Sequence, residues 1–364
     1  MEKQHSRLDF AGQTVDIGID LHKRQWGVAV YVGGYEHKVF VQPPRVEALV
    51  GYVRRHFPGA RYRCVYEAGC FGFWVHDALW EQGLECMVVN PADVPTRDKE
   101  RRHRTDRVDA RKLARGLRTG ELTAVYVPSR RALEARSLVR GRWELVKKQT
   151  RCKNQILAML TLYGMGLSEE EGRRRWSQHF LQRLGECRFR EPCGQQAFEA
   201  LLAELQYLRG LLAGVTRDIR ALAQEESYRG AVGHLVTIPG IGVLTAMILL
   251  TELMDIDRFR TLDHLASYAG LVPGEDSSGE RERTTGLTRR RNAHLRRLLI
   301  EASWVAVRKD PALMQCFLQW GRRMPKTQAI VRIARKLLNR IRYVLKHQVP
   351  YEIGVGPFGE GPEG

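Results

Sequence analysis

Three strand-like segments follow one another near the start of the chain, before helices and strands begin to alternate. Apolar and alternating residues predict strands at 15–21, 25–32 and 35–41, with Gly33-Gly34 as a two-residue hairpin turn. A helix at about 46–56, a strand at 62–67, a helix at 71–82 and a strand at 84–90 follow. This order predicts a mixed α/β domain that begins with three antiparallel strands.

The same order is typical of the ribonuclease-H-like fold, in which the first strand is central and carries the first metal-binding carboxylate. Here Asp20 ends the first strand and Glu67 ends the fourth, while Asp106 and Asp109 are three residues apart in a later segment. Mg²⁺ prefers oxygen ligands, and two such ions about 4 Å apart stabilise the attacking and leaving oxygens of a phosphodiester. The four carboxylates therefore predict a divalent-metal site that acts on a nucleic-acid backbone.

Asp106 and Asp109 are expected at the start of a helix that packs on the sheet. Residues 97–118 hold ten Lys or Arg against four acids. Apolar residues recur in this segment at helical spacing: Val108, Ala110, Leu113, Ala114 and Leu117. If the segment is helical, the two aspartates share one face, with their β-carbons roughly 5–6 Å apart.

The charge of the chain points to a polyanionic partner. Its 364 residues carry a formal net charge of +18, from 59 Lys and Arg against 41 Asp and Glu, and Arg outnumbers Lys. Such an excess is unusual for a metabolic enzyme and suits nucleic acid. Seven cysteines, an odd number in a long chain, favour a reduced cytoplasmic protein. No apolar run approaches the ~20 residues that span a bilayer, so no membrane partner is expected.

Four segments are predicted along the chain. Residues 1–128 form the α/β domain, and residues 129–230 form a helical, coiled-coil arm. Residues 231–350 form a helical domain, which begins at the glycine turn Ile238-Pro-Gly-Ile-Gly242 and contains a polar loop at 273–288 and a final helix at 327–346. Residues 321–346 hold nine basic residues and no acid, which is typical of a helix that meets phosphates. A disordered tail is predicted for 351–364.

The chain resembles the DEDD transposases of insertion-sequence family 110 over nearly its whole length. In the first half, the resemblance lies in four segments: Gly18-Ile-Asp-Leu-His-Lys23, Tyr66-Glu-Ala-Gly69, Val88-Val-Asn-Pro91 and Arg104-Thr-Asp-Arg-Val-Asp-Ala110. The second half adds Ile238-Pro-Gly-Ile-Gly242, Tyr268-Ala-Gly-Leu-Val-Pro273, Ser278-Gly279 and Leu295-Arg296. These segments occur in the family's order and at matching spacing.

The resemblance implies a RuvC-like N-terminal domain, a coiled-coil middle and a C-terminal transposase domain with a catalytic serine. It assigns Asp20, Glu67, Asp106 and Asp109 as ligands of Mg²⁺, or of Mn²⁺, and it selects Asp20 over Asp16, which shares its strand face. It implies recombination of double-stranded DNA at element ends and target, guided by a structured bridge RNA. The protein would act as a homo-oligomer, a dimer or tetramer, in the cytoplasm near the nucleoid.

The nucleophile implied by the resemblance is Ser278, with the adjacent Ser277 as an alternative. It would attack a DNA phosphate and keep the strand as a phosphoserine ester, which conserves the bond for rejoining. Two other classes stay open. One is a metal-dependent nuclease of the Holliday-junction type that cuts with activated water, and the other is a non-catalytic nucleic-acid-binding scaffold.

Overall fold

The chain forms two compact units, Met1–Pro128 and Ser129–Gly364. The structure, a computed structural model, describes residues 9–95, 105–165, 176–278, 281–287 and 292–353, although for 273–287 it describes the backbone alone. The boundary that sequence predicts near residue 230 falls inside the second unit, so it stays a prediction.

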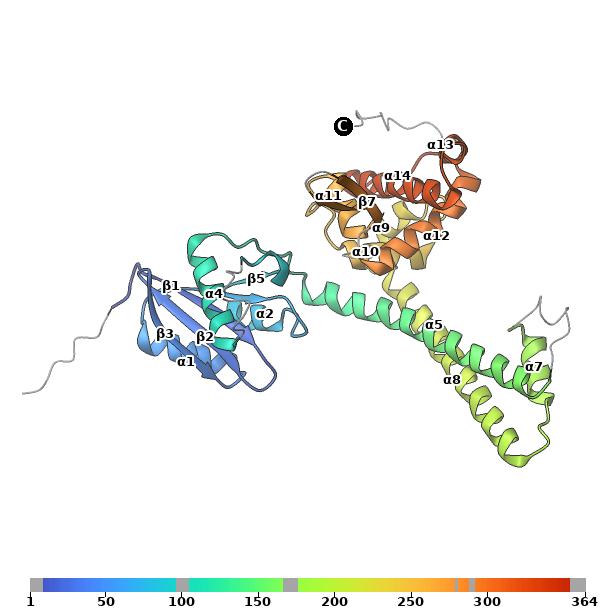
Figure 1. Ribbon diagram of the computed structural model, residues 1–364, viewed down its shortest axis with the longest axis horizontal. Coiled ribbons are helices and arrows are strands. Elements are labelled where there is room, and N and C mark those ends of the chain that lie inside the picture. Colours follow the sequence, from blue (N-terminus) through green and yellow to red (C-terminus); the bar gives the residue numbers. More distant parts are fainter. Residues whose placement is uncertain (1–8, 96–104, 166–175, 279–280, 288–291, 354–364) are drawn as a thin grey trace, which may run out of the picture. The chain divides into compact units, whose positions relative to one another are not determined.

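A five-stranded mixed sheet forms the centre of the first unit (Figure 1). The strands are β1 (Thr14–Leu21), β2 (Trp26–Val32), β3 (Tyr35–Gln42), β4 (Arg61–Glu67) and β5 (Glu85–Val89). Their order is β3-β2-β1-β4-β5, with β1 antiparallel to β2 and parallel to β4. The predicted strands and the central position of the first one are therefore confirmed.

The two faces of this sheet are covered by different helices. On one face, α1 (Val46–His56) and α2 (Trp74–Glu81) pack against apolar side chains of β1 and β2 such as Ile17 and Val28. On the other, α4 (Asp106–Thr119) packs through Ala110, Ala114 and Leu113. Asp106 and Asp109 thus lie in the first turn of a helix on the sheet, as predicted.

Helix α2 begins three residues later than the sequence pattern suggests. The intervening chain turns at Gly72, whose φ of 61° favours glycine, and Tyr66 donates a hydrogen bond of 2.9 Å to the Gly72 carbonyl. The turn separates the end of β4 from the helix.

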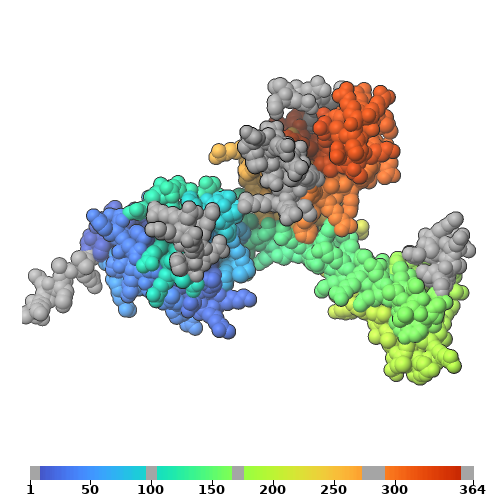
Figure 2. Space-filling model, viewed as in Figure 1, coloured from blue at the N-terminus to red at the C-terminus, as the bar shows by residue number. Residues whose placement is uncertain are grey.

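The second unit contains a long helical hairpin. Helices α5 (Arg130–Leu162) and α8 (Pro192–Leu222) pack against each other, and the short α7 (Gln178–Glu186) joins their shared core. Cys152, Ile156 and Leu160 of α5 meet Phe198 and Leu205 of α8 in that core. Figure 2 shows the side chains of the two helices packed together along the hairpin. A predicted arm of paired helices is present, whereas supercoiling of the pair stays a prediction.

A bundle of helices forms the rest of the second unit. They are α9 (Glu226–Leu235), α10 (Val243–Leu253), α11 (Leu262–Ala269), α12 (Ala293–Lys309), α13 (Pro311–Gly321) and α14 (Lys326–His347). The predicted apolar face of α14 lies in the core of this bundle through Ile333, Leu337 and Ile341. Tyr351, where the predicted tail begins, is buried and donates a hydrogen bond to Asp310, while residues 354–364 lie outside the described part.

The prediction of a polar loop at 273–288 is wrong for most of that segment. Its residues form an antiparallel pair of strands, β6 (Pro273–Ser278) and β7 (Arg281–Leu287). Most residues of these strands are polar, so the sequence lacks the alternation of apolar and polar residues that marks a half-buried strand.

No described helix has the length and apolar content needed to cross a bilayer.

Candidate active site

Two glycines allow α4 to lie directly on the sheet. A β-carbon at Gly18 would come within 2.1 Å of the Ala110 carbonyl oxygen, and one at Gly27 within 2.7 Å of the Asp106 carbonyl oxygen. Gly27 is also the residue that pairs with Asp20 across β1 and β2. The first turn of α4 is therefore held against the end of β1 because neither position carries a side chain.

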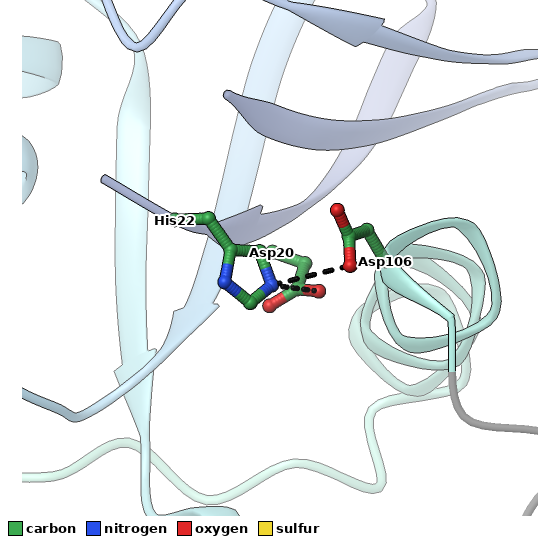
Figure 3. Close-up of side chains that lie close together, drawn as sticks. All are labelled: Asp20, His22 and Asp106. Atoms are coloured by element: carbon green, nitrogen blue, oxygen red, sulfur yellow. Dashed lines mark hydrogen bonds and ion pairs between the residues drawn. The ribbon is translucent and has the colours of Figure 1, made fainter. Parts of the chain in front are cut away.

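This seating brings Asp20 and Asp106 together around His22, as Figure 3 shows. The His22 Nε2 atom lies 3.1 Å from Asp20 Oδ2 and 3.3 Å from Asp106 Oδ1. One ligand atom from each of the three residues lies within 4.8 Å of the others. Gln25 donates a hydrogen bond of 3.0 Å to the second oxygen of Asp106, which fixes the orientation of that carboxylate.

The surroundings of Asp20 disfavour its ionised form, so a cation bound there would stabilise it. Burial raises the pKa of Asp20, and the negative charges of Asp109 and Asp106 raise it further. The ion pair and hydrogen bond with His22 act in the opposite direction. Asp109 is therefore close enough to Asp20 to repel it, although it lies outside the group of three.

Glu67 also lies outside that group, and a lysine holds it. Lys112 Nζ, from α4, is 3.7 Å from Glu67 Oε1 at the end of β4. Lys112 is only 8% exposed, which is unusual for lysine, so its ammonium group is enclosed beside Glu67. The structure thus brings Asp20 and Asp106 together around His22, whereas Glu67 lies beside Lys112.

Asp16, the alternative on the first strand, has a structural partner. Its carboxylate accepts a hydrogen bond of 2.7 Å from Arg63 Nε, and Arg63 Nη2 lies 2.6 Å away. The two residues are neighbours in the register of β1 and β4. This half-buried ion pair occupies Asp16 and leaves Asp20 as the β1 carboxylate that faces Asp106.

The candidate nucleophiles lie in the other unit, on β6. Ser278 is the last residue of that strand and pairs with Arg281, while Ser277 pairs with Glu282. The side chains of both serines lie outside the described part, as do the residues Gly279 and 289–291.

The donor set suits a divalent cation. Carboxylate oxygens are the ligands that Mg²⁺ and Mn²⁺ share, and imidazole is a further ligand for transition metals. The two carboxylates repel each other unless a cation lies between them. His22 Nε2 lies 3.1 Å from one carboxylate and 3.3 Å from the other.

Sequence reasoning missed His22, Gln25 and Lys112. A signal for His22 was available, because residues two apart in a strand share a face and His22 directly follows Asp20-Leu21. Lys112 carried no such signal, since a lysine in a basic helix is ordinarily solvent-exposed.

Comparison with known proteins matches both halves of the chain. Residues 17–165 match a DEDD transposase domain of the IS110 type, and residues 233–318 match a domain described as "Transposase IS116/IS110/IS902 family". The sheet with its clustered aspartates thus falls within the DEDD domain. Together, fold, site and matches define a DNA transposase, an enzyme that cleaves and rejoins DNA.

Curated relatives agree along most of the chain. A putative transposase of Sinorhizobium fredii is 32% identical over 293 residues, which are 79% of this chain and 70% of the relative. The transposase of insertion element IS1111A from Coxiella burnetii is 24% identical, over 84% of this chain and 80% of that protein. A pilin gene-inverting protein of Moraxella lacunata is 34% identical over 35% of this chain and 40% of its own length. The chain belongs to the IS110 family of insertion-sequence transposases.

Proposed function

We propose that this transposase exchanges DNA strands by combining the carboxylate site of its first unit with a serine nucleophile of its second. Asp20, Glu67, Asp106 and Asp109 hold Mg²⁺, or Mn²⁺, and Ser278 attacks the phosphate. The observation that carries the metal site is the convergence of Asp20 and Asp106 on one point 3.1–3.3 Å from each carboxylate, the position of His22 Nε2.

The first unit acts as a RuvC-like domain. Its strand order β3-β2-β1-β4-β5 supports this assignment, as do the ends of β1 and β4, which carry Asp20 and Glu67. The helix α4 supplies the last two carboxylates from its first turn. The long hairpin of α5 and α8 acts as a coiled-coil arm between protomers of a dimer or tetramer.

Each side chain near the carboxylates has a distinct part. Gln25 orients Asp106, His22 bridges Asp106 and Asp20, and Lys112 forms an ion pair with Glu67 that tempers its affinity for a cation. A bound divalent cation would supply charge to stabilise the oxygens of the phosphate during transfer.

The serine step conserves phosphodiester bonds. The Ser278 oxygen forms a bond to phosphorus and gives up its proton to a base, and the bond from phosphorus to one deoxyribose oxygen breaks. That oxygen takes up a proton and leaves as a hydroxyl. Attack by a hydroxyl of the second DNA then reverses the step and frees the serine, so no external energy source is required.

A structured guide RNA selects the two DNA sites. The support is electrostatic: the net charge of +18 and the acid-free helix α14 suit a second polyanion beside the DNA.

Covalent trapping tests this function. Purified protein, Mg²⁺, the RNA of its own locus and labelled element-junction DNA are incubated and resolved on a denaturing gel. We expect a protein–DNA adduct in wild type, loss of the adduct in Ser278→Ala and loss of all cleavage in Asp20→Asn. Ser277→Ala is the matched control and should retain the adduct.

Two results would redirect the assignment. Cleaved DNA without an adduct would favour a water-using nuclease, and an adduct that disappears in Ser277→Ala alone would move the nucleophile by one residue.

A further inference from the structure

A groove lined by arginines runs between the two helices of the hairpin. Four guanidinium groups line it, from Arg142 on α5 and from Arg209, Arg217 and Arg220 on α8. Gln149 and Thr216 add polar groups to its wall. The lining positions on α8 recur three and four residues apart, so they form one face of that helix.

These arginines have no acidic partners among the described residues. No described carboxylate forms an ion pair with any of the four, although other arginines of the same hairpin, such as Arg130 and Arg131, are paired. Arg142 donates a hydrogen bond of 2.9 Å to the Thr216 hydroxyl, and Arg209 donates one of 3.4 Å to the Trp176 carbonyl. Neutral acceptors orient these groups but leave their charges uncompensated.

The charges also repel one another. Burial lowers the pKa of Arg142, and the neighbouring charge of Arg220 lowers it further. Lys153 is affected in the same way, because burial and the charge of Arg209 lower its pKa. A protein that keeps like charges this close without a carboxylate has a site suited to an external anion.

We propose that this groove binds the phosphate backbone of duplex DNA, through residues other than the catalytic ones. The chain belongs to a family of DNA transposases, and arginine is the side chain best suited to phosphate oxygens. Arg209 and Arg217 are eight residues apart, about 12 Å along the helix, which is close to the width of the B-DNA major groove. The major groove of duplex RNA is narrow, so this separation favours DNA.

The test is the salt dependence of binding by the full chain. Fluorescence anisotropy would follow two labelled DNA duplexes of unrelated sequence and one RNA hairpin between about 50 and 200 mM salt. For Arg217→Ala/Arg220→Ala, we expect the slope of log K against log salt to fall by about 1.8 on both duplexes, since each lost phosphate contact removes about 0.9.

Arg130→Ala is the matched control, because it removes a charge from the same hairpin but one that Glu134 pairs at 3.0 Å. Its slope should stay close to that of wild type. The double variant should also melt no lower than wild type, because it relieves repulsion on Arg142. A slope that falls as much in the control as in the double variant would overturn the proposal.

The labelled RNA hairpin tests whether the groove binds the phosphates of RNA rather than those of duplex DNA. A slope that falls on RNA and stays unchanged on both DNA duplexes would overturn the DNA assignment and make RNA the occupant. Unchanged slopes on all three probes would show that the groove binds no nucleic acid. A fall on one DNA sequence alone would contradict backbone recognition, which is independent of sequence.

Discussion

Gly18 and Gly27 determine how closely α4 approaches the sheet, and so where Asp106 lies. Neither glycine takes part in chemistry. Their backbone contacts with α4 leave no room for a β-carbon, so the space between helix and sheet is fixed by main-chain atoms. The position of the carboxylates therefore depends on residues that bear no functional group.

We expect Gly27→Ala to displace the first turn of α4. The added carbon would lie 2.7 Å from the Asp106 carbonyl oxygen, and the overpacking should destabilise the first unit by about 1–3 kcal/mol. DNA cleavage should fall strongly, because Asp106 moves away from Asp20. Urea unfolding and a cleavage assay measure the two effects.

Gly51→Ala provides the control for that variant. A β-carbon at Gly51 in α1 meets nothing within 4 Å, so alanine there should stabilise the helix by about 0.5–1 kcal/mol. Normal cleavage in Gly27→Ala would show that the close approach of α4 is not required.

Lys112 should weaken cation binding at the site. If Glu67 is a metal ligand, the lysine 3.7 Å away competes for it. Lys112→Met should then bind Mn²⁺ roughly three- to tenfold more tightly, a modest change because Glu67 is partly exposed. Titration calorimetry on the protein without DNA measures this, and Lys112→Arg should bind as wild type does. Weaker binding in Lys112→Met would instead make the lysine a support for Glu67.

The sequence predicts the aspartates of this site better than their partners. Asp20 and Asp106 were found because strand ends and a helix start aim side chains predictably. Contacts such as Lys112 with Glu67 join residues 45 positions apart, and their distance depends on how α4 packs on β4. No local sequence pattern predicts how α4 packs on β4.

At the scale of elements, a buried carboxylate connects the arm to the start of α12, which follows β7 in the chain. Glu252 of α10 is 1% exposed, and Arg140 of α5 donates two hydrogen bonds of 2.7 Å to it. Burial alone would raise the pKa of Glu252, but hydrogen bonds from Arg140 and Asn292 and the positive charges of Arg140 and Arg136 lower it. The carboxylate is thus kept ionised inside the unit.

Asn292 joins this network to the strand pair. Its Nδ2 donates a hydrogen bond of 2.7 Å to Glu252, its Oδ1 caps α12, and its backbone N–H bonds to the Tyr268 carbonyl. Tyr268 and Asn292 lie on either side of β6 and β7 in the chain, so the network anchors both ends of the segment that carries Ser278.

Asn292→Ser separates anchoring from capping. Serine keeps the cap of α12 but loses the bond to Glu252, so we expect a loss of about 1.5–3 kcal/mol from the charged hydrogen bond. Asn292→Ala should lose about 1 kcal/mol more, since the cap is removed as well. Urea unfolding gives both values. Equal stabilities of the two variants would show that capping by Asn292 contributes nothing.

Element boundaries were predictable where apolar periodicity is strong. Residues 46–56 are a helix at the predicted bounds, and the predicted helix at 327–346 differs from α14 by one residue at each end, because both carry continuous helical patterns. Helix α13 was missed although Asp310 caps it and Pro311 begins it, since its short pattern stands between two stronger helices. The strands β6 and β7 were missed because their residues are polar on both faces.

At the scale of the whole molecule, the two units should be separable. Each has its own apolar core, and among the described residues the core of the sheet and the core of the helical bundle have no member in common. We expect residues 1–128 expressed alone to show one cooperative urea transition with retained β-sheet circular dichroism. An unfolded fragment would mean that the second unit is needed for the first to fold.

Because of the arginine groove, added salt should have opposite effects on the stability of the free protein and on that of its DNA complex. In the free chain, added ions screen the repulsion between Arg142 and Arg220, so the melting temperature of the hairpin should rise with salt. In the DNA complex, the same ions compete with the phosphates and promote dissociation. Calorimetric scans with and without duplex should therefore show melting temperatures that converge as salt increases. A free protein that melts lower in salt would mean that repulsion between Arg142 and Arg220 does not limit its stability.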